Sequence, residues 1–213
     1  MSGFRSAATI LLVCGVALSG CKIIKTPTAE EAAKADGGAF NPDKMAADAW
    51  DAKVIPFFNS KAAPLAEVLT AVSGDVETAG GKYGHREKQG NAPWTFAAKL
   101  EGRIVAVEAK SRAGYADVDI DGDAKPDVRV QIGPAVKGTA IRDSLDFVNF
   151  NEFKNQIEWA QYGKAFNAYV NGALLAKLPR DTLTGKRMKA VGAFPLPPKG
   201  EIPLFTPVII SVE

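Results

Sequence analysis

The sequence predicts an α+β protein in which N-terminal helices precede a barrel of five strands, with a long helix between the third strand and the fourth. Apolar residues recur at helical spacing over 41–74 and 151–176. Over 93–132 and again over 186–212 they alternate with polar residues, as half-buried strands do. Three strands, a helix and two closing strands is the chain order of an OB barrel, so we expect an OB-like barrel over 93–213. An irregular α+β sandwich is the alternative.

The first helix is predicted to begin at Asn41-Pro42-Asp43. Asparagine is a good N-cap, proline suits the first helical position, and aspartate is favoured in the first turn. We expect this helix to reach about Val54 and to end there, because Ile55-Pro56 disfavours its continuation.

A second helix is predicted to begin at Ser60, as its N-cap, and to end near Val72. One of its faces is apolar and holds Leu65, Val68, Leu69 and Val72. The glycine-rich stretch 74–91 that follows predicts a loop, and the only histidine of the chain, His85, is expected to lie there in solvent.

The first three barrel strands are predicted before residue 133. The first covers residues 94–100 and is broken at Gly102. The second covers 103–109, and residues 115–120 continue it after a bend. The third is 128–132, where Val128, Val130 and Ile132 alternate with polar side chains.

The long helix is expected over 151–176 and is closed by Leu178-Pro179. Its apolar stripe is Phe153, Ile157, Ala160, Phe166, Val170 and Leu174. The two closing strands are predicted over 186–194 and 204–212, and the first of these directs Met188, Ala190 and Phe194 inward.

The first twenty residues have the three parts of a secretory signal. Arg5 is followed by the apolar run Ala7–Ala17, which is too short to span a bilayer. The run ends in Leu18-Ser19-Gly20-Cys21, which resembles the bacterial lipobox. That resemblance implies cleavage before Cys21, a covalent lipid on its sulfur and fatty acylation, for example with palmitate, of the new amine. Two or more acyl chains hold a protein stably to a membrane.

The expected organisation is therefore a signal peptide over 1–20, a tether over 21–40 and a single domain over 41–213. We expect the domain to lie on the periplasmic face of the bacterial cell envelope, anchored to a membrane through its lipid. Lys22 follows the lipidated cysteine, and the absence of aspartate at that position slightly favours the outer membrane.

Composition excludes several classes of function. Removal of residues 1–20 takes Arg5 with it, so the formal net charge falls from +2 to +1, which offers no electrostatic case for nucleic acid. With Cys21 blocked by lipid, the domain holds no free thiol and no disulfide. With His85 as the only histidine, a multi-histidine metal site is impossible and a Ser-His-Asp triad would have to use that residue.

An acidic loop is the clearest local motif. Four carboxylates fall at alternating positions on either side of Gly122, namely Asp119, Asp121, Asp123 and Asp127. Ca²⁺ takes six to eight oxygen ligands, and alternate side chains on a turning loop converge on one point. The spacing resembles FG-GAP-type loops more than an EF-hand, since Val128 stands where an EF-hand needs glutamate. The alternative is an acidic turn between two strands, where Asp and Gly are favoured in any case.

A second motif runs through the middle of the chain. Its residues are Ile132-Gly133-Pro134, Gly138-Thr139, Arg142-Asp143, Leu145, Phe147, Phe150, Phe153 and Asn155-Gln156. Together with the lipobox and the closing strand that starts Gly185-Lys186-Arg187-Met188, they resemble the predicted periplasmic lipoproteins of the domain-of-unknown-function family DUF2291. Genes of this family often neighbour sugar-type ABC importers, so the resemblance implies an accessory role in uptake.

The same motif offers a candidate ligand site made of Arg142, Asp143, Asn155 and Gln156. A planar guanidinium and two amides suit the hydroxyls of a sugar. Its ring could stack on an aromatic side chain, for which the candidates are Phe147, Phe150 and Trp159. The alternative, which we favour, is structural: the polar residues tie the start of the long helix to the barrel, and the phenylalanines pack in the core.

These observations predict a non-catalytic lipoprotein that binds a small solute or a partner, such as a component of an ABC importer. Carboxylates are available for an envelope hydrolase, but nothing in the sequence pairs them. Oligonucleotide binding by the barrel is disfavoured by the near-neutral charge.

Overall fold

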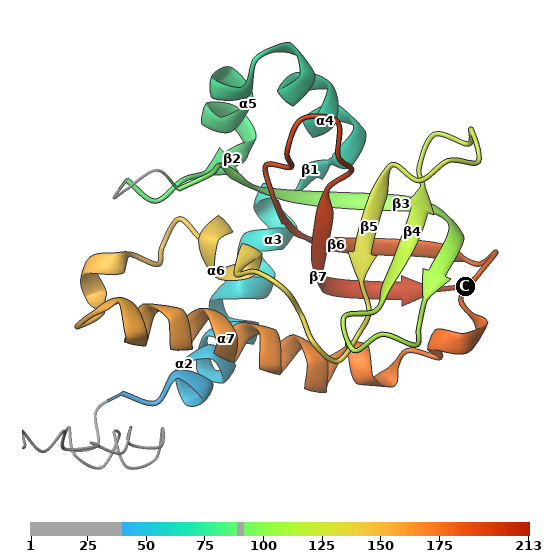
Figure 1. Ribbon diagram of the computed structural model, residues 1–213. Coiled ribbons are helices and arrows are strands. Elements are labelled where there is room, and N and C mark those ends of the chain that lie inside the picture. The colour runs from blue at the N-terminus through green and yellow to red at the C-terminus, as the bar shows by residue number, and fades with distance from the viewer. Residues whose placement is uncertain (1–39, 89–91) are drawn as a thin grey trace, which may run out of the picture. The chain divides into compact units, whose positions relative to one another are not determined.

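Five strands close into a barrel in the computed structural model, which describes residues 40–88 and 92–213 (Figure 1). They are β3 (Thr95–Glu108), β4 (Tyr115–Asp119), β5 (Val128–Gln131), β6 (Arg187–Pro195) and β7 (Leu204–Val212). The order around the barrel is β3-β4-β5-β7-β6, and β6 pairs again with β3. Only β5 and β7 pair in parallel within the barrel. With a long helix between β5 and β6, this is the predicted OB topology.

The first barrel strand is longer than predicted and is bent at Gly102. Residues of β3 up to Arg103 pair with β6, and from Arg103 onward they pair with β4. A Cβ atom at Gly102 would lie 2.3 Å from the carbonyl oxygen of Asp119, so only glycine allows the two backbones to approach this closely. The prediction that Gly102 ends a strand was therefore wrong. Residues 94–100 and 103–109 belong to one strand, and 115–119 form the second alone.

Aromatic rings fill the barrel interior. Phe96, Phe194 and Phe205 are fully buried, and the ring centres of Phe96 and Phe194 lie 5.3 Å apart. The opposite faces of the same strands carry Ala97, Ala193 and Val208, which pack against the helices. The barrel thus has a core inside and a second core on its outer surface.

The N-terminal helical stretch continues through Pro56. α2 (Pro42–Ala49) begins at Asn41, whose side chain accepts a hydrogen bond from the Lys44 backbone, as predicted. A π-helical turn, Trp50–Val54, connects it to α3 (Ile55–Lys61). The prediction that the helix ends at Ile55-Pro56 was wrong, because the wider turn just before the proline accommodates a residue without an N–H group.

Ser60 does not cap the next helix. Its hydroxyl donates to the Phe57 carbonyl, and α4 (Leu65–Gly74) begins only after Pro64. The predicted apolar face of α4 is confirmed, with Leu65 and Val68 buried and Leu69 and Val72 packed beside them.

The predicted loop over 74–91 contains regular structure. α5 (Val76–Tyr83) begins at Asp75, whose side chain caps it by accepting a hydrogen bond from the Thr78 backbone. Hydrogen bonding by the Thr78 side chain, and then by its backbone, lowers the pKa of Asp75. Two short strands, β1 (Ala63–Pro64) and β2 (Gly84–His85), pair with β3. His85 is therefore held in a strand, and the expectation of a solvated loop histidine was wrong.

The long helix α7 spans Gln156–Ala173, shorter than the predicted 151–176. The Asn155 side chain accepts hydrogen bonds from the backbone N–H groups of Ile157 and Glu158 and so sets a later start. The prediction that Ile157 and Ala160 face the core was wrong, since both are exposed, Ile157 by 68%. In Figure 1, α7 runs beneath the barrel, and it packs against α2. The buried residues of α7 are Tyr162, Gly163, Ala165, Phe166 and Val170.

The described residues lie within one compact unit, 39–213. The predicted signal peptide and Cys21, with the tether up to residue 39, lie outside the described residues. Among the residues described, no helix is both long and apolar enough to cross a membrane.

Candidate functional site

A pocket of about 770 Å³ opens where the barrel meets the helices. The barrel contributes the start of β3, the end of β6 and the start of β7, through Thr95, Pro195 and Thr206. The helical wall comes from α7 and from the short helix α6 (Ala140–Ser144), which follows β5 through a loop.

Arg142 of α6 is the central cation of this wall and is almost completely buried. Its Nε donates to Asp143 Oδ1 at 2.8 Å and its Nη1 to the Trp159 carbonyl oxygen at 2.8 Å, while Nη2 donates to Asp143 and to Thr139. The guanidinium carbon also lies 3.9 Å from the centre of the Trp159 ring. Arg142 therefore joins α6 to α7 and neutralises Asp143 inside the protein.

Both the side chain and the backbone carbonyl of Asp143 are held by neighbouring residues. Its carboxylate accepts from Arg142 and from the Thr139 hydroxyl, and its side chain remains 33% exposed in the pocket. Its backbone carbonyl lies 2.8 Å from Nδ1 of His85, so His85 fixes α6 to the strand β2. The position of the acidic group is consequently set by the barrel as well as by the helices.

The structure brings three of the four predicted ligand residues to this pocket and leaves one out. Arg142, Asp143 and Gln156 line it, and Gln156 is exposed at the start of α7. Asn155 does not line it, because its side chain is used to cap α7.

The predicted aromatic residues have different environments. Trp159 and Phe150 line the pocket, with their rings edge to face at 5.8 Å. Phe153 is buried against Trp159 and Tyr162. Phe147 packs against Phe57 outside the pocket. Because Arg142 covers the Trp159 ring, this tryptophan is not a free platform for stacking.

Sequence reasoning missed the barrel side of the pocket. Thr95 and Thr206 are almost fully buried there, and Glu87 and Lys137 contribute one charge of each sign. Thr139 belongs to the motif described above and Lys137 directly precedes its Gly138-Thr139 pair, so the motif pointed to part of this wall. Thr95 and Thr206 carry no such signal, because they approach one another only when the barrel closes.

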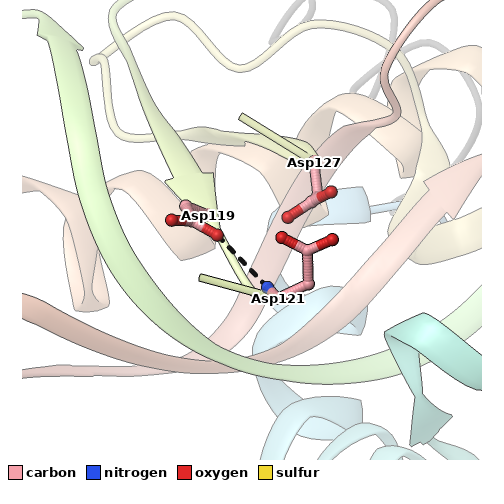
Figure 2. Close-up of side chains that lie close together, drawn as sticks. All are labelled: Asp119, Asp121 and Asp127. Carbon is pink, nitrogen blue, oxygen red and sulfur yellow. Dashed lines mark hydrogen bonds between the residues drawn. The ribbon is translucent and has the colours of Figure 1, made fainter. Parts of the chain in front are cut away.

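The acidic loop lies at the far end of β4, close to a separate pocket that also contains Arg103 and Arg187. Oxygen atoms of Asp119, Asp121 and Asp127 lie within 4.8 Å of one another. Figure 2 shows the carboxylates of Asp121 and Asp127 facing each other beside Asp119. Three hard oxygen ligands on one loop suit Ca²⁺.

Asp123, the fourth predicted ligand, is not part of this group. It accepts hydrogen bonds from the Lys125 backbone and ammonium group, which lower the pKa of its carboxyl. Asp119 is also engaged, since its two oxygens accept from the backbone N–H groups of Asp121, Gly122 and Ala124. Asp119 therefore organises the loop in its own right, and calcium binding stays a prediction.

Comparisons with known proteins agree with this fold. The family model described as "Predicted periplasmic lipoprotein (DUF2291)" matches residues 11–211. A solved OB-fold protein from Thermotoga maritima is similar over 82% of this chain and 99% of its own, with a TM-score of 0.64 and 19% sequence identity. At that identity the likeness shows the fold alone. No curated protein matches the chain.

Proposed function

The chain belongs to the predicted periplasmic lipoprotein family DUF2291, and from this premise we propose that it is a lipid-anchored, non-catalytic binding module whose working site is the pocket between the OB barrel and α6 and α7. The family description, predicted periplasmic lipoprotein, supports a location in the cell envelope. The lipid on Cys21 and a preference for the outer membrane, drawn from Lys22, are part of the proposal.

The pocket is the observation that carries this proposal. Its size falls within the usual range for small-molecule sites, roughly 300–1,000 Å³. Its wall combines a rigid polar group, Arg142 with Asp143, with the aromatic side chains of Phe150 and Trp159. Sites for small solutes have this composition: mostly apolar surface with a few fixed polar groups.

The arrangement favours binding over hydrolysis. A carboxylate-based hydrolase needs two carboxyl groups that flank the substrate and are available to exchange protons or to attack. Asp143 accepts three hydrogen bonds from Arg142 and Thr139, so its carboxylate is already engaged as an acceptor. The hydrogen-bond network of Arg142, Asp143 and Thr139 therefore favours binding of a solute over proton transfer to it.

We further propose that the bound solute is delivered to, or monitored for, a sugar-type ABC importer. The family resemblance supports this role, and an anchored module on the periplasmic side of a membrane is suitably located for it. A small solute or an importer component would then be the partner.

The experiment uses a variant that fills the pocket from its rim. Ala160 is exposed on α7 and lines the pocket, whereas Ala168 is exposed two turns further along and does not. Full-length protein in detergent is incubated with the small-molecule fraction of envelope extract, and retained compounds are identified by mass spectrometry.

We expect the wild type and Ala168→Trp to retain the same compound and Ala160→Trp to lose it. Retention by all three proteins, or by none, would contradict the pocket as the working site. In cells, deletion of the gene should reduce uptake of the retained compound, and unchanged uptake would contradict the importer role.

A further inference from the structure

Two threonines form the barrel side of the pocket. Along β3 and β7, Phe96 and Phe205 point into the barrel, so their neighbours Thr95 and Thr206 point to the opposite face, where the pocket lies. Thr95 is 2% exposed and Thr206 is 1% exposed. Both side chains therefore belong to the buried barrel side of the pocket.

The hydroxyl groups of these threonines have unused hydrogen-bonding capacity. Thr206 Oγ1 accepts a hydrogen bond from Gln131 Nε2 at 2.8 Å, but its own proton has no acceptor among the described residues. The Thr95 hydroxyl makes no hydrogen bond with any residue in the described part of the chain. The Thr95 oxygen is not among the fully enclosed polar atoms that lack a partner in the described part of the chain, so it reaches the pocket. Water or a ligand group there can bond to both hydroxyls.

The side chain of Thr206 is held in place by Gln131. Gln131 donates to the Thr206 hydroxyl and to the Lys137 carbonyl, and its own carbonyl accepts from the Lys137 backbone N–H at 2.7 Å. Because Gln131 occupies an oxygen lone pair of Thr206, the hydroxyl proton is left to point elsewhere. A hydroxyl group that a neighbouring side chain holds in one orientation is typical of a binding site.

The residues that line the pocket carry no net charge. Arg142 is buried, and four of its five N–H groups donate to Asp143, Thr139 and the Trp159 carbonyl. Within residues 40–88 and 92–213, the only hydrogen bond that Oδ2 of Asp143 accepts comes from Thr139, so this oxygen can accept another. Glu87 and Lys137, which also line the pocket, contribute one charge of each sign, so the lining as a whole is neutral. A hydroxyl group of a ligand can accept from threonine and donate to Asp143.

We propose that the pocket recognises a neutral, polyhydroxylated solute, with Thr95, Thr206 and Asp143 as its hydrogen-bonding residues. The inference rests on the proposed function of the pocket and adds the ligand class and two residues on the barrel side. The ligand enters with a hydroxyl-bearing end directed toward β3 and β7. The ring of Phe150, which lines the pocket, then contacts the carbon skeleton.

The test compares three probes with the same ring: D-glucose, D-glucuronate and D-glucosamine in its protonated form. D-xylose and mannitol extend the neutral set. Binding to the full-length protein in detergent is measured by isothermal titration. We expect at least one neutral probe to bind, and glucuronate and glucosamine to bind at least about tenfold more weakly than glucose if glucose is that probe.

Isosteric variants test the two hydroxyls. Thr95→Val and Thr206→Val should each weaken binding of the neutral probe about tenfold, whereas Thr206→Ser, which keeps the hydroxyl, should bind nearly as the wild type does. Thr182→Val is the matched control, since the Thr182 hydroxyl donates to the Pro179 carbonyl outside the pocket. Thermal melting confirms that each variant is folded.

Equal or tighter binding of a charged probe, unchanged affinity in both valine variants, or no binding of any neutral probe would overturn this ligand class. Failure here remains distinct from failure of the proposed function. If envelope extract still yields a compound that Ala160→Trp excludes, the pocket is a binding site and only the ligand class is wrong.

Discussion

The guanidinium carbon of Arg142 lies 3.9 Å from the centre of the Trp159 ring, and Nη1 of the same arginine donates to the Trp159 backbone carbonyl. One side chain thus contacts both the ring and the backbone of a residue on another helix. Since Arg142 also holds Asp143, the relationship fixes the helical wall of the pocket to a single geometry.

Arg142→Met is therefore expected to destabilise the protein. Removal of one partner of a buried ion pair costs about 3–5 kcal/mol, and the partial exposure of Asp143 places this case near 3 kcal/mol. Arg187→Met is the control, because Arg187 pairs with Glu101 on the surface, where an ion pair contributes about 0–1 kcal/mol. Urea unfolding measures both, and equal losses in the two variants would refute a structural role for Arg142.

Gly163 permits the close contact between α6 and α7. A Cβ atom there would lie 2.6 Å from Thr139 Cγ2 and 3.0 Å from Arg142 Nη1. We expect Gly163→Ala to lower the free energy of unfolding by about 1–3 kcal/mol, as overpacking does. Gly172 lies on the same helix with open space around its Cβ position, so Gly172→Ala should be neutral or stabilise by up to about 1 kcal/mol. A neutral Gly163→Ala would show that the helices can separate without cost.

Because of Tyr162, the free energy of unfolding is expected to fall at alkaline pH. Burial raises the pKa of its phenol above the usual value near 10.0, and Glu152 adds to the shift. The folded state thus favours the neutral phenol, and its contribution is complete below the unfolded pKa and is lost as pH rises through the folded one. Wild type should lose stability above about pH 10 more steeply than Tyr162→Phe. Parallel curves for the two proteins would contradict this role of Tyr162.

The calcium prediction implies different effects for substitutions at Asp121 and at Asp123. If the three-carboxylate group binds Ca²⁺ with the millimolar affinity of many extracellular sites, calcium at roughly 10–100 times Kd should stabilise the protein by about 1–3 kcal/mol. Asp121→Asn should abolish this gain, and Asp123→Asn, which changes a carboxylate outside the group, should keep it. Isothermal titration without heat at millimolar Ca²⁺ would refute the prediction.

The sequence predicted the barrel because its strands alternate strongly and its long helix has a clear apolar stripe. It failed at places where one residue type has two structural uses. A glycine such as Gly102 predicts a strand end, whereas here it allows a continuous strand to bend against β4. Pro56 predicts a helix end, but a π-helical turn precedes it and the helical stretch continues.

The candidate site was predictable only where its residues are neighbours in sequence. Arg142 and Asp143 are adjacent, and Gln156 follows in the same motif, so their contribution to one wall was accessible from the sequence. Asn155 was expected in the site, but its side chain caps α7, a role for which asparagine is equally well suited. Thr95 and Thr206 come together through the pairing of β3 and β7 with β6, and that register is set by barrel closure.

Lipid on Cys21 is proposed to anchor this domain in the envelope. Labelling of growing cells with radioactive palmitate, followed by fractionation, tests it most directly. We predict that the wild type carries label and sediments with membranes, whereas Cys21→Ala carries none and leaves the membrane fraction. An unlabelled wild type, or a Cys21→Ala protein that sediments as completely as the wild type, would contradict the account.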